Sequence, residues 1–409
     1  MLNIRMAFRN IFRYKKRSLI TAFAIAVGVM FTIAIDGLLA GSEQESSRNI
    51  RDFETGEAKI YPEGYFTDRL FLPFSFFLEK EDRAKIEQSL AGYKAAPRVE
   101  LSAELYFNED YFAVPGSTSA KISCVDPVRD GTVFKTAYKI DEGRWLKSGD
   151  EGIVIGSWLA ADIGAKTGYV LSVECKGRGG FYQTFDAEII GIVTTEDPYV
   201  NRASVFMDLS RADDLLQLGG AVTEYTVRLD KTPALKELKA AMPSYAKNIY
   251  SWEQVAADLI KLTKTKSGMS KLYLMFMFII AAVGISNTML MAVMERKNEI
   301  GMMRALGYSS FRIRLLFLIE GFGIGLLGAS AGLAAGCVIN FFMSVYGIDF
   351  SSLLRNMDAG YRITGIMRSS WNWEGIGATV IGSLAISTFV AWFPSGKILK
   401  SEVAEILRK

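Results

Sequence analysis

Four long apolar segments alternate with polar ones along the chain of 409 residues. They cover residues 18–40, 271–294, 311–348 and 374–396. A helix rises about 1.5 Å per residue and the hydrocarbon core of a bilayer is about 30 Å thick, so about 20 helical residues span it. Each segment is long enough, and the pattern therefore predicts four transmembrane helices.

The first apolar segment has two interpretations, a cleaved signal peptide or a retained transmembrane helix. A basic stretch precedes it and Ala40-Gly41 follows it. That basic stretch is longer than a signal peptide needs, and no A-x-A site follows a short apolar core. We expect retention, with residues 1–17 forming a basic amphipathic helix that lies on the membrane and binds anionic headgroups rather than nucleic acid.

The distribution of Lys and Arg predicts the orientation. Basic residues gather in residues 1–17, in the loop 295–310 and in the tail 397–409. Loops rich in Lys and Arg stay on the cytoplasmic side, so we expect these three segments and both termini to be cytoplasmic. Residues 41–270 and the loop 349–373 then lie outside the cytoplasm.

The long polar region, residues 41–270, carries both strand and helix patterns and predicts an α+β domain inserted between the first two transmembrane helices. We expect strands at 58–61, 99–107, 121–125, 152–155, 170–175, 187–193, 204–207 and 225–229, and helices at 80–90, 157–163, 211–218 and 234–241. Helical patterns also run through residues 36–49 and 251–271, which form either helical stalks or flexible linkers.

Composition separates two environments. Residues 41–270 carry 28 basic and 35 acidic side chains, and the rest of the chain has a net charge of +10. The chain has no histidine, which excludes Ser/His/Asp and Cys/His relays and His-ligated metals. We expect no catalytic residues, no metal and no cofactor bound by this chain. Cys124 and Cys175 either form a disulfide or stay reduced.

Two glycine-rich stretches resemble nucleotide-binding loops only superficially. The stretch at 177–180 lies between two predicted strands, where a phosphate site needs a following helix, so a hairpin turn is the better interpretation. The stretch at 164–167 lacks the glycine that a phosphate-binding loop requires before its lysine. The sequence therefore contains no nucleotide-binding motif.

Between the second and third apolar segments lies a compact charged segment, residues 295–310. Gly307 is a good helix terminator and Ser309 or Ser310 a good cap for the next helix. We expect a short helix with Ile300, Met303 and Leu306 available to a partner, with an ordinary surface loop as the alternative.

The run E-R-x-x-E-I-G-x-x-R-A-L-G at residues 295–307 resembles the coupling segment of FtsX/MacB-type permeases of ABC transporters, among which the lipoprotein-releasing LolC/LolE group is most similar. Shorter similar pieces occur at 7–10, 142–144, 156–160, 320–321 and 393–396, in the same order. The order of the apolar segments and the large loop after the first one also match.

The resemblance implies a non-catalytic permease subunit of the bacterial inner membrane. Its partners would be a second permease, identical or homologous, and two copies of a separate ABC ATPase that binds ATP and Mg. In the family the coupling helix touches the ATPase. In this sequence that contact maps onto Glu295, Arg296, Glu299, Gly301, Arg304 and Gly307.

The third apolar segment contains glycines at four-residue spacing, which allow a neighbouring helix to approach closely. These are Gly321, Gly325, Gly328, Gly332 and Gly336. Lining of a transport path is the alternative to packing. Asp36 and Glu320 are acids within or at the edge of a span, and we expect them to pair with Arg312 or Arg314 or to reach outward to solvent.

The resemblance implies a lipoprotein or another amphipathic molecule as cargo, passed to a periplasmic carrier. Three acyl chains of roughly 15 methylenes each would cost on the order of 36 kcal/mol in water, so they need an apolar cavity. We expect its lining in the first two spans, with core packing as the alternative. The residues are Met30, Phe31, Ile35, Leu38, Leu39, Met275, Phe276, Met277 and Phe278.

Two other functions stay open within the same superfamily. One is MacB-like export of drugs, peptides or toxins. The other is FtsX-like signalling to an extracytoplasmic cell-wall hydrolase, against which the size of residues 41–270 argues.

Overall fold

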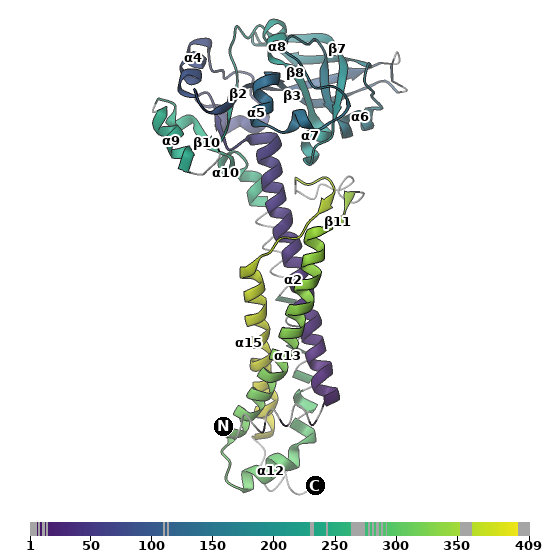
Figure 1. Cartoon of the computed structure of the whole chain (residues 1–409), viewed down its shortest axis with the longest axis vertical. Coiled ribbons are helices and arrows are strands. Elements are labelled where there is room, and N and C mark those ends of the chain that lie inside the picture. Colours follow the sequence, from purple (N-terminus) through teal and green to yellow (C-terminus); the bar gives the residue numbers. More distant parts are fainter. Residues whose placement is uncertain are drawn as a thin grey trace. The chain divides into compact units, whose positions relative to one another are not determined.

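The computed structural model describes most of the chain, in two compact units (Figure 1). The helical unit comprises residues 1–44, 264–349 and 366–409, and the sheet unit comprises residues 45–263 and 350–365. The described residues are 6, 9, 13, 15–108, 111–112, 114–229, 233–242, 244–262, 275–276, 279, 282–283, 286–287, 289–291, 293–351 and 362–399.

The helical unit contains α2 (Lys15–Asn49), α12 (Lys297–Ala305), α13 (Ser310–Val345), α15 (Trp373–Leu399) and a short hairpin of β11 (Ile348–Asp349) with β12 (Ile366–Met367). Within the described residues, three helices are long and apolar enough to cross a membrane, at Ser18–Thr55, Ser310–Val345 and Trp373–Trp392. They correspond to the first, third and fourth predicted spans. Half of the predicted span 271–294 lies outside the described residues, as do most of residues 1–17 and all of residues 400–409.

The first helix does not end where its apolar segment does. It continues to Asn49 and is followed directly by the π-helical turn η1 (Ile50–Thr55). The residues after the first span are thus helical, as the stalk interpretation expected. Before residue 263, α10 (Trp252–Val255) is followed by helical residues 257–262.

The glycines of α13 lie where neighbouring helices come closest. Gly321 and Gly325 face α15, and Gly328, Gly332 and Gly336 face α2. A Cβ atom at Gly332 would lie 2.5 Å from the carbonyl oxygen of Ala26 and 2.8 Å from the Cβ of Val29. Only a residue without a side chain permits this approach. The five glycines therefore let α13 pack against a helix on each of two sides.

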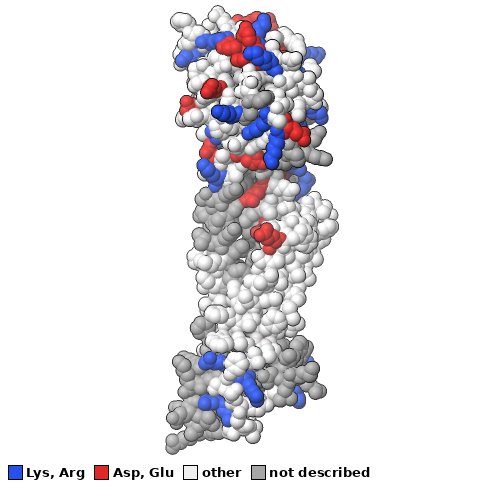
Figure 2. Space-filling model, turned by 90° about the vertical axis from the view of Figure 1, so that its left-hand side faces the viewer, with Lys and Arg blue, Asp and Glu red and all other residues white. Residues whose placement is uncertain are grey.

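Polar groups also join the three helices at one end of their apolar part. Asn372 donates a hydrogen bond to Asp36 at 2.9 Å. The backbone N–H of Ser370 donates to the carbonyl oxygen of Gly37 at 2.9 Å, and the buried Asn340 donates to the carbonyl oxygen of Ser370. Figure 2 shows few charged atoms along the middle of the helical unit on the face it displays, and Lys and Arg atoms gathered at one end of that unit.

Substitution of Gly332 by Ala should destabilise the helical unit by about 1–3 kcal/mol, because the added methyl group overlaps α2. Gly377→Ala in α15 is the matched control, since a Cβ atom added at Gly377 would have no neighbouring atom within 4 Å. We expect thermal unfolding of the purified full chain in detergent to give a lower midpoint for Gly332→Ala alone. Equal midpoints for the two variants would contradict this packing.

The sheet unit alternates strands with short helices. Its strands are β1 (Ala58–Ile60), β2 (Lys94–Phe107), β3 (Gly116–Val125), β4 (Ile140–Gly143), β5 (Ile153–Gly156), β6 (Val170–Lys176), β7 (Tyr182–Val193), β8 (Ser204–Asp208), β9 (Glu224–Arg228) and β10 (Ile249–Ser251). Its helices are α3 (Tyr65–Asp68), η2 (Arg69–Phe71), α4 (Lys80–Ser89), α5 (Pro127–Val133), η3 (Thr136–Tyr138), α6 (Ser157–Ile163), α7 (Pro198–Ala203), α8 (Leu209–Leu216), α9 (Pro233–Ala241), η4 (Ala246–Asn248) and α10. All eight predicted strands and four predicted helices are confirmed.

The ten strands found in the described residues of this unit form one mixed sheet. Its order is β10-β1-β9-β2-β3-β8-β5-β7-β4, and β6 pairs with both β2 and β7. The pairs β3/β8 and β5/β7 are parallel and the others antiparallel. Because β6 connects β2 to β7, the strands β2, β3, β8, β5, β7 and β6 close into a ring.

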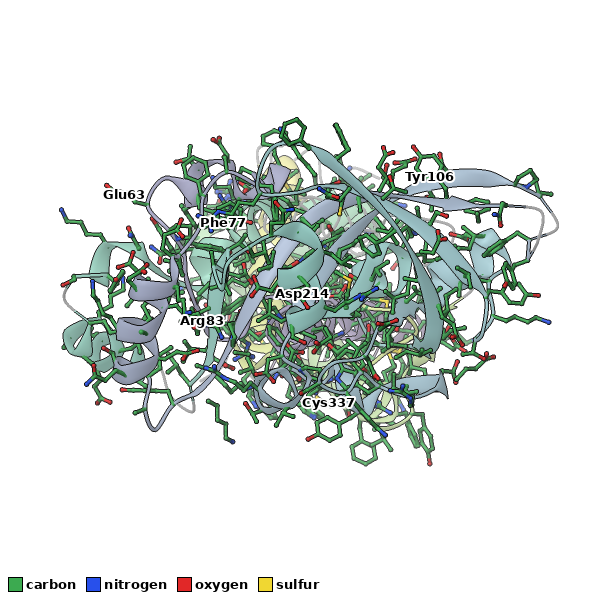
Figure 3. The ribbon with its side chains drawn as sticks, turned by 90° about the horizontal axis from the view of Figure 1, so that it is seen from above. Glu63, Phe77, Arg83, Tyr106, Asp214 and Cys337 are labelled. Atoms are coloured by element: carbon green, nitrogen blue, oxygen red, sulfur yellow. The ribbon has the colours of Figure 1, made fainter. Side chains whose placement is uncertain are left out.

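Apolar side chains of the ring strands form the main core of the sheet unit. Leu101, Ile122, Ile155, Val173 and Val205 are all fully buried in it. Tyr106, near the end of the β2–β3 hairpin in Figure 3, is exposed instead. Burial alternates along β6, whereas β5 and β8 are buried throughout, so the sequence predicted these strands from alternating and from continuously apolar runs.

Two local predictions in the sheet unit are also resolved. Residues 177–181 form the turn between β6 and β7, closed by a 2.8 Å hydrogen bond from the N–H of Gly177 to the carbonyl oxygen of Phe181. Cys124 and Cys175 are both buried free thiols, and burial raises the pKa of Cys175 to about 11. The glycine-rich stretch is thus a hairpin, and the two cysteines are reduced.

Candidate functional site

The short helix α12 is fixed to α13 by a buried ion pair. Arg296, which immediately precedes α12, donates from Nη1 to Glu320 Oε2 of α13 at 2.9 Å. Both side chains are almost completely buried, with 4% and 0% of their surface exposed. The guanidinium also lies 5.5 Å from the centre of the Phe317 ring. We expected Arg312 or Arg314 as the partner of Glu320, and the ion pair that the structure shows joins Glu320 to Arg296 instead.

Glu299 extends this pair toward the surface. Its Oε2 accepts from Arg296 Nε at 3.1 Å, and its Oε1 accepts from Arg13 at 3.4 Å. Glu299 lies in the first turn of α12, where a negative charge also stabilises the helix dipole. Glu299 thus connects α12 with Arg13 of the basic N-terminal segment.

An apolar cluster packs the face of α12 that carries Ile300 against α13. Ile300 packs with Val293, Ile313 and Phe317, all of them buried. Ile300 is therefore unavailable to a partner, contrary to our expectation, because the face of α12 that carries it is turned toward α13. Met302 and Leu306 are the exposed apolar residues of this segment, at 54% and 80%.

The six predicted coupling residues divide into two groups. Arg296 and Gly301 are buried and so do not present a surface, and Arg296 holds α12 in place through Glu320. Glu295 and Gly307 are exposed, and Glu299 and Arg304 are partly exposed. Gly307 has a φ of +86° just after the helix, a conformation that favours glycine, and Ser309 caps α13 by accepting from the N–H of Arg312.

The predicted cavity residues that the structure describes are exposed or partly exposed in this single chain. Phe31 and Ile35 are each 50% exposed, and Met30, Leu38 and Leu39 are partly exposed. Met275 and Phe276 are exposed as well, and Met277 and Phe278 lie outside the described residues. A single chain therefore leaves these apolar side chains uncovered.

Loss of either partner of the Arg296–Glu320 pair should destabilise the helical unit by about 3–5 kcal/mol, because the other charge is left buried and unpaired. We expect Arg296→Met and Glu320→Leu each to lower the unfolding midpoint of the full chain, and the double variant to recover most of the loss. Additive losses in the double variant would show that the two residues do not act as a pair.

Besides the Arg296–Glu320 pair of the helical unit, the sheet unit contains a buried group of ionisable side chains around Asp197. Asp197 caps α7 by accepting from the N–H of Tyr199 at 2.8 Å. Burial raises the pKa of Asp197 well above its usual value, the negative charge of Glu54 adds to the shift, and the positive charge of Arg362 opposes it. Arg362 pairs with Glu54 at 3.0 Å and lies 4.7 Å from the centre of the Tyr199 ring.

The segment that carries Arg362 is fastened to the rest of the sheet unit. Asn49 donates to the carbonyl oxygen of Arg362 at 2.7 Å, and the N–H of Arg362 donates to Ser46 at 3.0 Å. Thr364 donates to the carbonyl oxygen of Thr195 at 3.3 Å. Residues 362–364, which come from the loop after α13, are thus held at the end of α2 and beside α7.

The raised pKa of Asp197 predicts a pH dependence. The carboxyl of Asp197 binds its proton more tightly in the folded state than in the unfolded state. The folded protein therefore loses stability as the pH rises from about 4, the usual pKa of an Asp, through the raised pKa. Asp197→Asn keeps a capping side chain without the charge, so it should stabilise the sheet unit at pH 8 by about 1 kcal/mol or more, and less at pH 5. Thermal unfolding at both pH values measures this. Asp126→Asn, at the N-cap of α5, is the control for the cap, and equal shifts in both variants would contradict the assignment.

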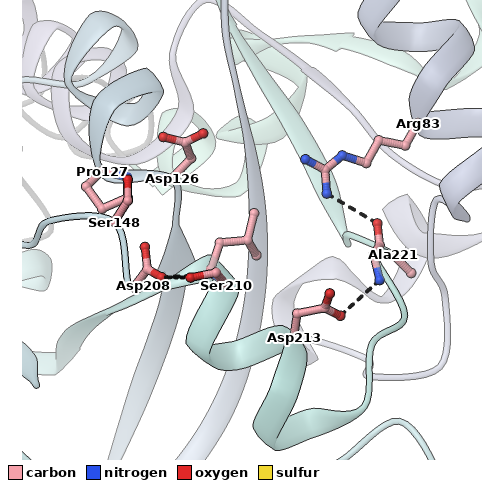
Figure 4. Close-up of a pocket in the computed structure, with 10 residues that line it drawn as sticks. Arg83, Asp126, Pro127, Ser148, Asp208, Ser210, Asp213 and Ala221 are labelled. Carbon is pink, nitrogen blue, oxygen red and sulfur yellow. Dashed lines mark hydrogen bonds between the residues drawn. The ribbon is translucent and has the colours of Figure 1, made fainter. Parts of the chain in front are cut away.

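A pocket of about 260 Å³ beside α8 gathers three carboxylates, drawn in Figure 4. Each one already accepts backbone hydrogen bonds: Asp126 from Val128 and Arg129, Asp208 from Gly149 and Ser210, and Asp213 from Gly220. These bonds cap helices and close a turn. In the part of the chain that the structure describes, no group of three or more Cys, Asp or Glu residues could hold a metal ion.

Comparison with known families matches both parts of the chain. Residues 18–245 match the MacB-like periplasmic core domain, and residues 271–403 match the FtsX-like permease C-terminal family. The first match covers more than half of the chain.

Three relatives show the extent of the similarity. An uncharacterized ABC transporter permease of Methanocaldococcus jannaschii is 24% identical over 99% of this chain and 97% of its own length. The uncharacterized ABC transporter permease YknZ of Bacillus subtilis is 22% identical over 99% of this chain and 98% of its own. The macrolide export ATP-binding/permease protein MacB of Bradyrhizobium diazoefficiens is 22% identical over 96% of this chain, which spans 58% of that protein.

Proposed function

Since this chain belongs to the MacB- and FtsX-like permeases of ABC transporters, we propose that it is the membrane subunit of an ATP-driven complex and that α12 receives the movement of a separate ABC ATPase. Two ATPase copies would bind ATP and Mg. A second permease, identical or homologous, would complete the complex in the bacterial inner membrane, with both termini cytoplasmic.

The buried pair Arg296–Glu320 carries this proposal. A helix that transmits a displacement must be fixed to the element that it moves, and α12 is fixed to α13 by this pair and by the cluster around Ile300. Its other side presents Met302 and Leu306 beside the partly exposed charges of Glu299 and Arg304. Exposed apolar residues next to charges are a suitable docking surface for a protein partner.

In the complex, an amphipathic cargo or a second permease would cover the exposed apolar residues of α2. Acyl chains need an apolar environment throughout transport, and two facing copies of the α2 surface would provide one. We infer lipoprotein extraction, with delivery to a periplasmic carrier, as the form of transport that the LolC/LolE resemblance favours. The similarity to a macrolide export protein favours the alternative, export of drugs, peptides or toxins.

Arg304→Glu should abolish the permease-dependent ATP turnover of the reconstituted complex, a loss of about tenfold or more, because it reverses a charge on the docking surface of α12. The fold should stay intact, since Arg304 is partly exposed. Lys147→Glu, an exposed charge reversal in the sheet unit, is the matched control. Unchanged turnover in Arg304→Glu would exclude this role for α12.

Depletion of the protein in its host is the experiment that distinguishes the two candidate cargoes. Lipoproteins retained in the inner membrane after depletion would support extraction. Normal lipoprotein sorting with increased sensitivity to exported compounds would support the MacB-like alternative.

A further inference from the structure

Polar contacts bound the apolar part of α13 at both of its ends. Glu320 is buried against Arg296 at one end, and the buried Asn340 donates to the carbonyl oxygen of Ser370 at the other. Asn340 follows Glu320 by 20 residues, which is about 30 Å of helix at 1.5 Å per residue. This length equals the thickness of the hydrocarbon core of a bilayer, so Asn340 marks the boundary of the core that is remote from α12.

The exposed apolar face of α13 continues past this boundary. Leu327 and Val338 are exposed before it, at 52% and 55%, and Phe342 and Val345 are exposed after it, at 53% and 50%. At 3.6 residues per turn, these four side chains lie within a sector of about 60° on one face of the helix. The face that α13 exposes in the membrane therefore extends about 8 Å beyond Asn340, since five further residues rise 1.5 Å each.

The hairpin of β11 and β12 adds to this apolar face. Gly347 turns the chain just after α13 with a φ of +70°, and a Cβ atom there would meet Cγ2 of Ile366. The absence of a side chain at Gly347 thus lets the hairpin pack directly on the end of α13 (Figure 1). Ile348 and Ile366 are 37% and 46% exposed, so the hairpin itself presents apolar side chains.

Aromatic side chains with a polar atom gather at the same end of the helical unit. Tyr346 is 72% exposed and stacks on Phe342, with 6.2 Å between the ring centroids. Trp371 and Trp373, at the start of α15, stack at 5.3 Å and are 38% and 70% exposed. Trp371 directly follows Ser370, which accepts the hydrogen bond of Asn340 and so lies at the boundary of the core. Tyr and Trp are the residue types enriched where a bilayer meets water.

The head-group layer of a bilayer matches this surface in thickness and in polarity. It adds about 5–8 Å to each side of the hydrocarbon core, which is the distance that the apolar face of α13 extends beyond Asn340. The hairpin also carries the exposed charges of Asp349 and Arg368. Charged side chains are costly in the hydrocarbon core, and large exposed apolar ones are unfavourable in water. Phospholipid head groups and the upper parts of their acyl chains accommodate both kinds.

We propose that the last turn of α13 and the hairpin of β11 and β12 form a phospholipid-binding surface in the leaflet remote from α12, which is the outer leaflet in the orientation proposed above. Val345 and Ile348 contact the upper acyl chains, and Tyr346 lies among the head groups. Residues 362–364, which are hydrogen-bonded to the end of α2, precede β12 directly. The bilayer therefore restrains this segment through the hairpin, and its thickness affects the position of the segment.

Photo-crosslinking identifies what covers this surface. Tyr346 is replaced by p-benzoylphenylalanine in the full chain, which is reconstituted in nanodiscs of phosphatidylcholine, illuminated and analysed by peptide mass spectrometry. We expect the peptide that contains position 346 to gain the mass of one phospholipid. Phe181, an apolar residue of the sheet unit that is 77% exposed, is the matched control position and should give no lipid adduct. A crosslink from position 346 to a second copy of the chain, or the absence of a lipid adduct there, would overturn the proposal.

Spin labels measure the depth of the same surface. Val338→Cys, Val345→Cys and Phe181→Cys are labelled separately in a Cys337→Ala background, since the two cysteines of the sheet unit are buried. Oxygen concentrates in the bilayer, whereas a nickel chelate stays in water. We expect the label at 345 to lie about 10 Å closer to water than the label at 338, since seven residues separate them, and still to favour oxygen more than the label at 181. Equal preference at 345 and 181 would contradict the proposal. Neither assay needs an ATPase, so neither result depends on the role of α12.

Discussion

The structure of the helical unit depends on how one buried charge is neutralised. Glu320 lies on a helix long and apolar enough to span a membrane, with none of its side-chain surface exposed, and an ionised carboxylate there is costly unless it is paired. Arg296 provides that pair from the residue before α12. The same contact that neutralises the charge therefore fixes the position of α12 on α13.

Fixing α12 to α13 has consequences for the other helices. The glycines of α13 bring it into close contact with α15 on one side and with α2 on the other, so α12 is connected through α13 to both helices. The helix α2 continues into η1 without a break, and residues 362–364 are hydrogen-bonded to the end of α2 and to the region before α7. The chain passes between the two units at four points, at 44/45 within α2, 263/264, 349/350 and 365/366.

Much of the fold follows from local sequence patterns. Apolar runs of about 20 residues identify the spans, and alternation identifies strands such as 170–175 and 187–193, because both signals depend on neighbouring residues alone. The closure of the ring by pairing of β6 with β2 could not be predicted, since their register joins Tyr106 to Ser172 across the sequence. For the same reason the sequence does not identify Arg296 as the partner of Glu320, for which both expected outcomes, pairing with Arg312 or Arg314 and reaching outward to solvent, are wrong. The expectation that Ile300 lies on the free face of α12 is also wrong. Which face of a short helix is buried depends on the element that it packs against.

We propose that α12 and α13 move as one body during the ATP cycle. Spin labels at Met302 on α12 and Phe322 on α13, both exposed, measure the distance between the two helices in the complex with its ATPase. We expect the same narrow distance distribution with and without ATP, and a broad one when Arg296 is replaced by Met. A distance that changes with ATP while the Arg296–Glu320 pair is intact would show that the two helices do not move as one body.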